Sequence, residues 1–206
     1  MQRVLDILSS GVHDAKNQLF RAESLLVQAE AEHGITLGEA RYAIELAALR
    51  LSGVLATYKL QRHVETLSIG MASAGELIEE VVLVNREHCD RLGLEIIGDS
   101  SADEPWPLDR DLVLDILSNA LQNASRFARR QIRMSACHAD GFLLLRIEDD
   151  GPGFEEPDID RMAKLGVGLF VARELAALHR RHDRHGRVEL RNGGELGGAI
   201  MEVWLP

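Results

Sequence analysis

The feature that most restricts how this chain can fold is an apolar repeat near its N-terminus. Apolar residues recur there at alternating spacings of four and three positions, at Leu8, Val12, Ala15, Leu19, Ala22, Leu26 and Ala29. This spacing lines one seam of a helix that packs in a coiled coil, and it does not fit the period of two that a strand requires. The sequence therefore predicts a long first helix over residues 4–29.

A second helix is predicted directly after the first. Gly34 ends the first helix, and Thr36 with Glu39 forms the T-x-x-E pattern of a helix N-terminus. The seam continues in the second helix at Ala40, Ile44, Ala47, Leu51, Val54 and Tyr58. Each helix offers one apolar stripe, so two of them alone bury too little surface. We therefore expect residues 1–69 to form an antiparallel helical hairpin that pairs with a second copy in a four-helix bundle, as a homodimer.

The pattern changes after residues 70–75, a stretch rich in Gly, Ala and Ser that we interpret as a hinge. From residue 74 onward, helices alternate with short strands. The predicted helices are 76–91, 110–127 and 170–179, and the predicted strands are 94–97, 131–137, 142–147, 188–191 and 199–205. Residues 74–206 are therefore expected to form an α/β sandwich with a mixed sheet, which makes the whole chain α+β.

Charge and hydropathy restrict the function. Lys and Arg number 23 against 33 Asp and Glu, and the net charge of −10 argues against a nucleic-acid or membrane partner. No stretch approaches the roughly 20 apolar residues of a membrane span, so we expect a cytoplasmic protein. Cys89 and Cys137 lack metal-ligand spacing and are expected to be reduced thiols. The basic, His-rich run 179–187 is expected to be a solvated loop after a helix.

An acidic and glycine-rich loop is predicted directly after strand 142–147. Its sequence is Asp149-Asp150-Gly151-Pro152-Gly153-Phe154. The Asp149 carboxylate, at the end of a strand, can accept a hydrogen bond from the amino group of adenine, and glycines let the backbone approach a ligand closely. The same pattern also occurs in ordinary turns, so by itself the loop leaves both interpretations open.

Two further patterns are typical of phosphate and metal binding. Gly166 and Gly168 precede the last predicted helix, and glycines that open a helix expose backbone N–H groups to which phosphate oxygens bind. Asn119 and Asn123 share one face of helix 110–127, where an amide oxygen can complete a magnesium shell. The alternatives are a plain helix start and a buried structural amide.

In their order and spacing, the three motifs resemble the N-box and the two glycine boxes of the GHKL-type ATPase domain of histidine kinases. The resemblance covers residues 74–206 and implies a Bergerat-type fold that binds ATP and Mg²⁺, with Asp149 on adenine and Asn123 on the metal. It assigns the nucleotide site to Asn119, Asn123, Arg126, Phe127, Asp149, Gly151, Gly153, Gly166, Gly168 and Leu169. Only eleven residues separate Phe154 from Gly166, and the family's lid is usually longer, so nucleotide affinity or lid closure is expected to differ.

Another group of candidate residues lies on the first predicted helix, in the run His13-Asp14-Ala15-Lys16-Asn17. His13 lies beside the seam residue Val12 and outside the seam, so we expect its ring at the bundle surface. A neutral imidazole is a competent nucleophile near neutral pH, and Asp14 can orient the ring or take its proton. The alternative for an isolated His-Asp pair on a helix is a solvated surface pair.

This run is similar to the H-E/D-x-x-N/T box of dimerisation and phosphotransfer domains, which also precedes an ATPase domain in those kinases. The resemblance implies that His13 accepts a phosphoryl group and that Asp14 is its acid-base partner. It also implies that Asn17 orients the water that hydrolyses a response regulator's aspartyl phosphate. Gln18 stands where many relatives have proline, so a kink in the helix is expected to be absent.

The sequence therefore predicts an ATP-dependent protein-histidine kinase of a two-component pathway, which passes a phosphoryl group from His13 to an aspartate of a receiver domain. The sensor is either a separate protein that touches the bundle or another part of a longer kinase. The main alternative is a phosphotransfer adaptor whose second domain no longer binds nucleotide, and the short lid favours it. A serine/threonine kinase of the anti-sigma type fits residues 74–206 only. Phosphorylation within one chain or across the dimer stays open.

Overall fold

The computed structural model describes residues 67–154 and 167–206, and between residues 11 and 51 it describes single positions and short runs. The chain divides into two compact units, Met1–Arg62 and His63–Pro206. In the first unit, described positions on both sides of Gly34 are helical, and Gly34 has a φ of +64°, which glycine adopts without strain. The bundle stays a prediction. Within the described residues, no helix is both long and apolar enough to span a membrane.

The second unit alternates helices and strands from Ile69 to Leu205. Its helices are α3 (Ala74–Arg91), α4 (Arg110–Phe127) and α5 (Val167–Leu178). Its strands are β1 (Ile69–Ala72), β2 (Glu95–Ser100), β3 (Trp106–Asp109), β4 (Gln131–Ala139), β5 (Phe142–Asp149), β6 (Arg180–Arg181), β7 (Arg184–His185), β8 (Arg187–Asn192) and β9 (Ala199–Leu205). The helix predicted over residues 110–127 is confirmed at both ends.

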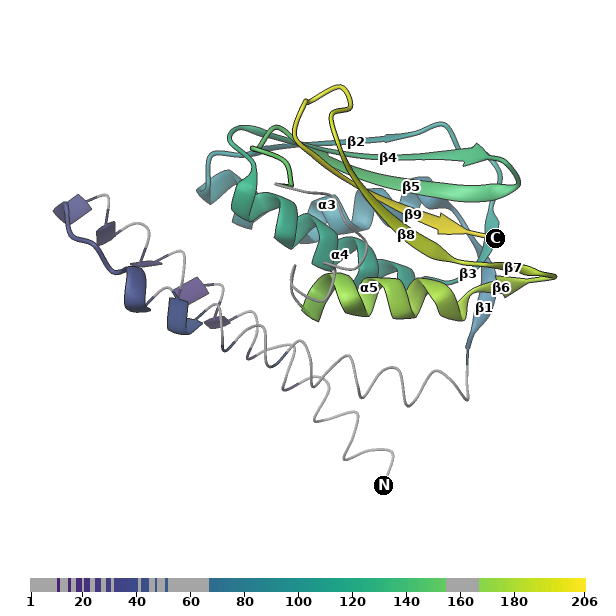
Figure 1. Cartoon of the computed structure of the whole chain (residues 1–206), viewed down its shortest axis with the longest axis horizontal. Helices are drawn as coiled ribbons and strands as arrows, with labels where there is room; N and C mark the ends of the chain where they lie inside the picture. Colours follow the sequence, from purple (N-terminus) through teal and green to yellow (C-terminus); the bar gives the residue numbers. More distant parts are fainter. Residues whose placement is uncertain are drawn as a thin grey trace. The chain divides into compact units, whose positions relative to one another are not determined.

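The main sheet has five strands in the order β2-β4-β5-β9-β8. β2 runs parallel to β4, and the other neighbours are antiparallel. β1 pairs with β3, and β6 pairs with β7, in two small antiparallel sheets. The three helices lie together on one face of the main sheet (Figure 1). The predicted α/β sandwich with a mixed sheet is thus confirmed for this unit.

The hydrophobic core lies between these helices and the sheet. The largest fully buried side chains are Leu77, Leu108, Leu112, Ile116, Leu117, Leu121, Ile132, Met134, Leu143, Leu145 and Leu175. On β4 every second residue from Ile132 to Ala136 is buried, as in a strand with one face on the core. On β5, the central strand, nearly every residue is buried. Each such side chain contributes about 2 kcal/mol of hydrophobic stabilisation, so β5 is held firmly.

Helix α3 is flanked by residue types that are typical of helix ends. The Ser73 hydroxyl accepts a hydrogen bond from the Glu76 N–H (3.4 Å) at its start. Just beyond its end, Gly93 has a φ of +70°, the left-handed conformation of a helix C-terminus. Near that end Cys89 is buried, and burial together with the neighbouring Asp90 raises the pKa of its thiol to about 11. The thiol therefore stays protonated at neutral pH, as expected for a structural cysteine.

Helix α4 begins at a buried carboxyl that joins three parts of the unit. Asp109 accepts hydrogen bonds from the Leu112 N–H at Oδ1 (3.2 Å) and from the Ser68 N–H at Oδ2 (2.9 Å). The Asp109 N–H donates to Nε2 of His179 (3.0 Å), at the end of α5. The segment before β1, the start of α4 and the end of α5 are therefore tied together at Asp109.

Two sequence-based expectations are wrong. The presumed hinge at residues 70–75 is instead β1, paired residue by residue with β3, followed by the first turn of α3. The run 179–187 is not simply a solvated loop: it contains the β6–β7 hairpin, and His179 is only 3% exposed. Burial lowers the pKa of His179, although hydrogen bonding to the Leu175 carbonyl opposes this shift. Sequence analysis missed both features because these strands are only two to four residues long.

Candidate functional site

Asp149 lies at the end of the central strand and is only 4% exposed. Its Oδ1 accepts hydrogen bonds from the backbone N–H groups of Gly151 (2.8 Å) and Ala199 (3.2 Å). Within the described part of the chain, the hydrogen bonds to this carboxyl all end on Oδ1. As far as the described residues show, Oδ2 can therefore accept a hydrogen bond from a ligand.

Burial raises the pKa of Asp149 above its ordinary value, although the two backbone N–H groups act in the opposite direction. The neighbouring Asp150 carboxylate raises the pKa further. A ligand that donates a hydrogen bond to such a carboxyl stabilises the charged form that burial disfavours. The electrostatics of Asp149 thus favour a donor group in the ligand.

Around the Asp149 carboxyl, two positions have room only for glycine. A Cβ on Gly151 would lie 2.5 Å from the Phe127 carbonyl oxygen and 2.8 Å from Asp149 Oδ1. A Cβ on Gly198 would lie 2.6 Å from Asp149 Oδ1 and 2.7 Å from the Gly151 nitrogen. The Gly198 N–H also donates to the Asp149 carbonyl oxygen (3.1 Å). Backbone packs so closely here that only glycine fits at either position.

The adjacent Asp150 carboxyl has a different role from that of Asp149. Its Oδ1 accepts hydrogen bonds from the N–H groups of Arg129 (2.7 Å), Arg130 (3.0 Å) and Gln131 (3.2 Å). Burial by itself raises the pKa of Asp150, but the backbone donors lower it more, so the pKa lies below its ordinary value. Asp150 therefore holds the end of β5 against the start of β4 as a carboxylate.

The glycine-rich loop is also fastened at its far end. The Phe154 N–H donates to Asn192 Oδ1 (2.7 Å), and Asn192 Nδ2 donates to the Phe154 carbonyl oxygen (2.7 Å). Gly153 has a φ of +78°, and a Cβ there would lie 2.8 Å from Asn192 Oδ1. The structure thus explains Gly153 by its backbone conformation and its contact with the end of β8.

The last turns of α4 adjoin the Asp149 loop, because the Phe127 carbonyl oxygen lies against Gly151. Asn119 and Asn123 lie one turn apart on α4 and are half-buried, beside the fully buried core face of the helix. Arg126 and Phe127 are exposed at the end of the helix, and 62% of Phe127 is accessible. The structure therefore brings the C-terminal part of this helix next to Asp149.

The other predicted site residues are less completely described. Gly168 lies in the first turn of α5, and Leu169 is buried. Gly166 lies outside the described residues. His13, Asp14 and Asn17 also lie outside them, so their placement stays a prediction.

The oxygen atoms available at this site are of the kinds that an adenine nucleotide with a divalent cation needs. Asp149 Oδ2 suits an amino donor, and the amides of Asn119 and Asn123 supply neutral oxygens. Among the described residues, no group of three or more His, Cys, Asp or Glu side chains could hold a metal ion. A cation here would therefore need oxygens from the ligand and water, which is how Mg²⁺ is held beside substrate phosphates.

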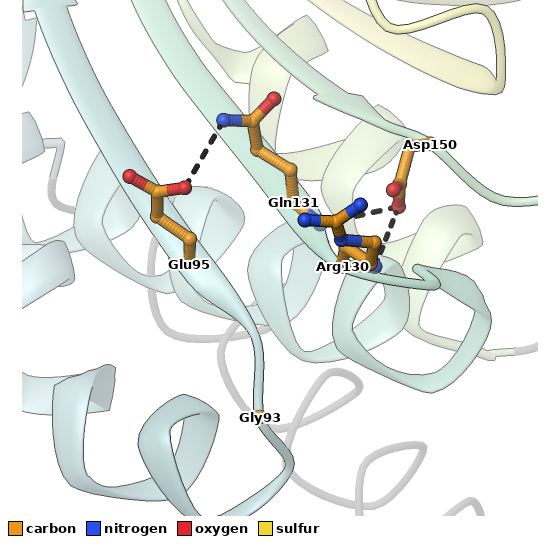
Figure 2. A pocket seen from close by; sticks show the side chains of 5 residues that line it. All are labelled: Gly93, Glu95, Arg130, Gln131 and Asp150. Atoms are coloured by element: carbon orange, nitrogen blue, oxygen red, sulfur yellow. Dashed lines mark hydrogen bonds between the residues drawn. The ribbon is translucent and has the colours of Figure 1, made fainter.

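A separate hollow of about 420 Å³ lies at the start of β2 and β4 (Figure 2). Its lining residues are Gly93, Glu95, Arg130, Gln131 and Asp150. Gln131 Nε2 donates to Glu95 Oε2 (3.3 Å), and the Asp150 carboxyl is engaged by the backbone of β4. Asp149 does not line this hollow, so the hollow is separate from the surroundings of the Asp149 carboxyl.

Sequence analysis missed three contributors to this site: the backbone clamp of Asp150, the Asn192 clamp and Gly198. A Gly-Gly pair before the last strand and an Asn-Gly-Gly turn were visible signals of tight backbone. Their partners are far away in sequence, so only the folded chain shows that Gly198 touches Asp149 and that Asn192 holds Phe154.

Residues 108–206 match the family described as histidine kinase-, DNA gyrase B- and HSP90-like ATPase. This range contains α4, the Asp149 loop and α5. The match therefore covers every residue predicted to bind nucleotide.

Sensor kinases are among the curated relatives. The sensor protein kinase CarS of Pseudomonas aeruginosa is 32% identical over 113 residues, which are 50% of this chain and 24% of CarS. The virulence sensor histidine kinase PhoQ of Salmonella typhimurium is 25% identical over 213 residues, which cover 97% of this chain and 40% of PhoQ. The chain thus spans about a quarter to two fifths of the length of these relatives.

Solved histidine kinases share the fold. AdeS of Acinetobacter baumannii superposes with a TM-score of 0.60 at 18% identity, covering 92% of this chain and 94% of that one. The catalytic domain of ThkA gives a TM-score of 0.59 at 18% identity, covering 68% of this chain and 96% of that one. The chain is thus similar in sequence to sensor histidine kinases over most of its length, and its residues 108–206 match the histidine kinase-, DNA gyrase B- and HSP90-like ATPase family.

Proposed function

We propose that this chain is the core of an ATP-dependent protein-histidine kinase in a two-component pathway. The observation that carries the proposal is Asp149, a buried carboxyl whose Oδ1 is held by backbone donors, while no described residue donates a hydrogen bond to its Oδ2. It lies within the residues that match the histidine kinase-, DNA gyrase B- and HSP90-like ATPase family.

In this proposal the adenine amino group donates to Asp149 Oδ2, while Gly151 and Gly153 shape the loop beside the base. The phosphates lie toward the last turns of α4 and the start of α5. There Asn119, Arg126 and Phe127 flank them on one side, and Gly166, Gly168 and Leu169 supply the helix start on the other. When bound, Mg²⁺ would neutralise phosphate charge, and Asn123 would hold it.

The phosphoryl acceptor is His13. One imidazole nitrogen attacks the γ-phosphorus, an N–P bond forms as the bond to the β,γ-bridging oxygen breaks, and ADP leaves. Asp14 orients the ring and takes its proton. The phosphoryl group then passes from His13 to an aspartate carboxylate of a receiver domain, and Asn17 positions the water for the later hydrolysis of that acyl phosphate.

The helical hairpin of residues 1–69 serves as a homodimerisation and phosphotransfer domain, and residues 74–206 bind ATP. The antiparallel seam supports pairing of two copies, because each predicted helix carries a single apolar stripe. We place the protein in the cytoplasm, where ATP and a response regulator are available. Its input comes from a separate sensor or from another part of a longer kinase.

The test is labelling with γ-phosphate-labelled ATP and Mg²⁺. Wild-type protein should gain an acid-labile, base-stable phosphoryl group, and His13→Gln should gain none while binding ATP as before. His33→Gln is the matched control: His33 is an exposed histidine of the first unit, and this variant should label like wild type.

Two outcomes contradict the proposal. If His13→Gln labels like wild type, His13 is not the acceptor. If wild type binds no nucleotide yet accepts phosphate from a phosphorylated receiver, the chain is a phosphotransfer adaptor and not a kinase.

A further inference from the structure

Positive charge is concentrated at the end of the sheet opposite Asp149. The exposed basic residues of the β6–β7 hairpin and of the start of β8 are Arg180, Arg181, His182, Arg184, His185 and Arg187. The same segment has one exposed acid, Asp183, in a chain whose net charge is −10. We call these arginines, with the aromatic rings beneath them, the hairpin surface. The hairpin projects from the unit near the C-terminus (Figure 1).

This surface is distant from the candidate nucleotide site. Phe142, whose ring belongs to the hairpin surface, is the first residue of β5, whereas Asp149 is the last residue of the same strand. At about 3.3 Å per residue, the two ends of this strand lie roughly 23 Å apart. A ligand on the hairpin surface would therefore not overlap a nucleotide at Asp149.

Arg181 of the hairpin surface stacks on a tryptophan. The guanidinium carbon of Arg181 lies 5.5 Å from the ring centroid of Trp106. Trp106 is itself packed against the His138 ring, with centroids 4.9 Å apart. Its indole N–H donates to the Pro206 carbonyl oxygen (3.2 Å), which fixes the ring in place. Arg181 thus rests on a rigid platform.

Two further arginines share a second aromatic platform. The guanidinium carbons of Arg184 and Arg187 lie 5.1 and 4.8 Å from the centroid of Phe142. Arg187 also lies 4.4 Å from the centroid of Trp204. Phe142 and Trp204 meet edge to face, with centroids 6.1 Å apart. Cation–π contacts therefore hold these guanidinium groups in place before any ligand arrives.

Hydrogen bonds orient the same two side chains. Arg184 Nη1 donates to the carbonyl oxygens of Asp140 (2.8 Å) and Gly141 (3.2 Å), and Arg187 Nε donates to Glu189 (2.6 Å). Each guanidinium has other nitrogens that these bonds do not use. An oriented guanidinium loses less side-chain entropy on binding and suits the bidentate geometry of a carboxylate.

The contacts favour an acidic protein segment over a nucleic acid or a membrane. Bases stack on open aromatic faces, but here Arg181 and His138 pack against Trp106, while Arg184 and Arg187 lie over Phe142. Membrane docking gains strength from apolar side chains that insert, and among the described residues the exposed large hydrophobics include none from residues 180–187. The interpretation that remains is that the oriented guanidinium groups bind anionic side chains of a protein.

We propose that the hairpin surface is a docking site for a carboxylate-rich segment of a partner protein. Stacked guanidinium groups of Arg181, Arg184 and Arg187 would pair with its Asp or Glu side chains, and Arg180 would add charge at the rim. The site does not depend on ATP binding or on the role of His13.

The experiment measures binding of a fluorescein-labelled oligoglutamate peptide to the full chain by anisotropy, over a series of salt concentrations. Arg181→Ala/Arg184→Ala should weaken binding by about tenfold or more. The matched control is Arg86→Ala/Arg91→Ala, which removes the same charge from exposed positions of α3 and should leave affinity nearly unchanged. Thermal unfolding of both variants should show that they are folded.

A third variant separates oriented recognition from simple charge attraction. Arg181→Lys/Arg184→Lys keeps the charge but loses the planar fork, and should weaken binding several-fold. Equal affinity of this variant and wild type, or an equal loss in the α3 control, would overturn the proposal. So would hairpin-dependent binding that is tighter to oligodeoxythymidine or to phosphatidylserine vesicles than to the peptide, or hairpin-dependent self-association in sedimentation.

Discussion

The two ends of strand β5 are built from different groups. At its C-terminal end, the buried Asp149 is surrounded by closely packed backbone. This backbone and the Asp149 carboxyl leave no space for a side chain at Gly151 or Gly198. At its N-terminal end, Phe142 is covered by long arginine side chains that are themselves exposed. Close backbone packing thus characterises the first end, and exposed positive charge characterises the second.

This difference determines how each end should tolerate substitution. Backbone next to Asp149 is fixed by the sheet and cannot move aside, so an added methyl group forces a rearrangement. The arginines at the other end are partly solvated and can adopt other rotamers at small cost. Substitutions near Asp149 should therefore be costly, and substitutions near Phe142 should be tolerated.

The largest effect is expected for Gly198→Ala. The new Cβ would lie 2.6 Å from Asp149 Oδ1 and 2.7 Å from the Gly151 nitrogen. We expect the free energy of unfolding to fall by about 3 kcal/mol, with loss of ATP binding, in urea denaturation and calorimetry. Gly75→Ala is the control, because Gly75 lies in the first turn of α3 and its new Cβ would lie 3.7 Å from the nearest atoms, those of Ser73 and Ser100, which is an ordinary contact that should not destabilise. Equal stability of the two variants would contradict the packing argument.

The next largest effect is a loss of ATP affinity that leaves unfolding stability intact. Asp149→Asn keeps an oxygen for the N–H groups of Gly151 and Ala199, but places an amide donor where adenine should donate. We expect ATP binding to weaken by about 1–3 kcal/mol in calorimetry. Because burial raises the pKa of Asp149, removing its charge should leave unfolding stability at neutral pH unchanged or higher. Unchanged affinity would mean that adenine binds elsewhere.

A smaller and pH-dependent effect is expected at the neighbouring carboxyl. Asp150→Ala removes the acceptor for three backbone N–H groups and should lower stability at pH 7 by about 1 kcal/mol, since solvent weakens these partly exposed bonds. The folded-state pKa lies below the ordinary value. The contribution is therefore complete above the ordinary pKa and is lost as pH falls through the folded-state pKa. A difference between variant and wild type that stays constant through acid unfolding would contradict this role.

The smallest effect is expected at the other end of β5. Arg184→Gln removes a cation–π contact with Phe142 and the charge, but little packing. We expect unfolding stability within about 0.5 kcal/mol of wild type and an unchanged ATP affinity. A several-fold loss of ATP affinity in calorimetry would show that the two ends are coupled through the strand.

The sequence predicted the larger elements of the second unit well. α4 was placed by its apolar face and its flanking signals, and β4, β5, β8 and β9 by apolar runs next to turns. The short strands β1, β3, β6 and β7 were not predicted, because two to four residues carry too little periodicity to be distinguished from loop. Their formation depends on partners such as β3 for β1, which lie about forty residues away.

The sequence by itself determined which residues could carry chemistry, since carboxylates, amides and glycines at these spacings have few other uses together. It placed Asp149 after a buried strand and Asn119 and Asn123 on one helix face, because strand and helix periods are local properties. Only the tertiary structure decided that Asp149 is the buried carboxyl with an oxygen left for a ligand while Asp150 clamps β4. That choice depends on Gly198, Ala199 and the start of β4, which reach the loop only when the sheet has formed.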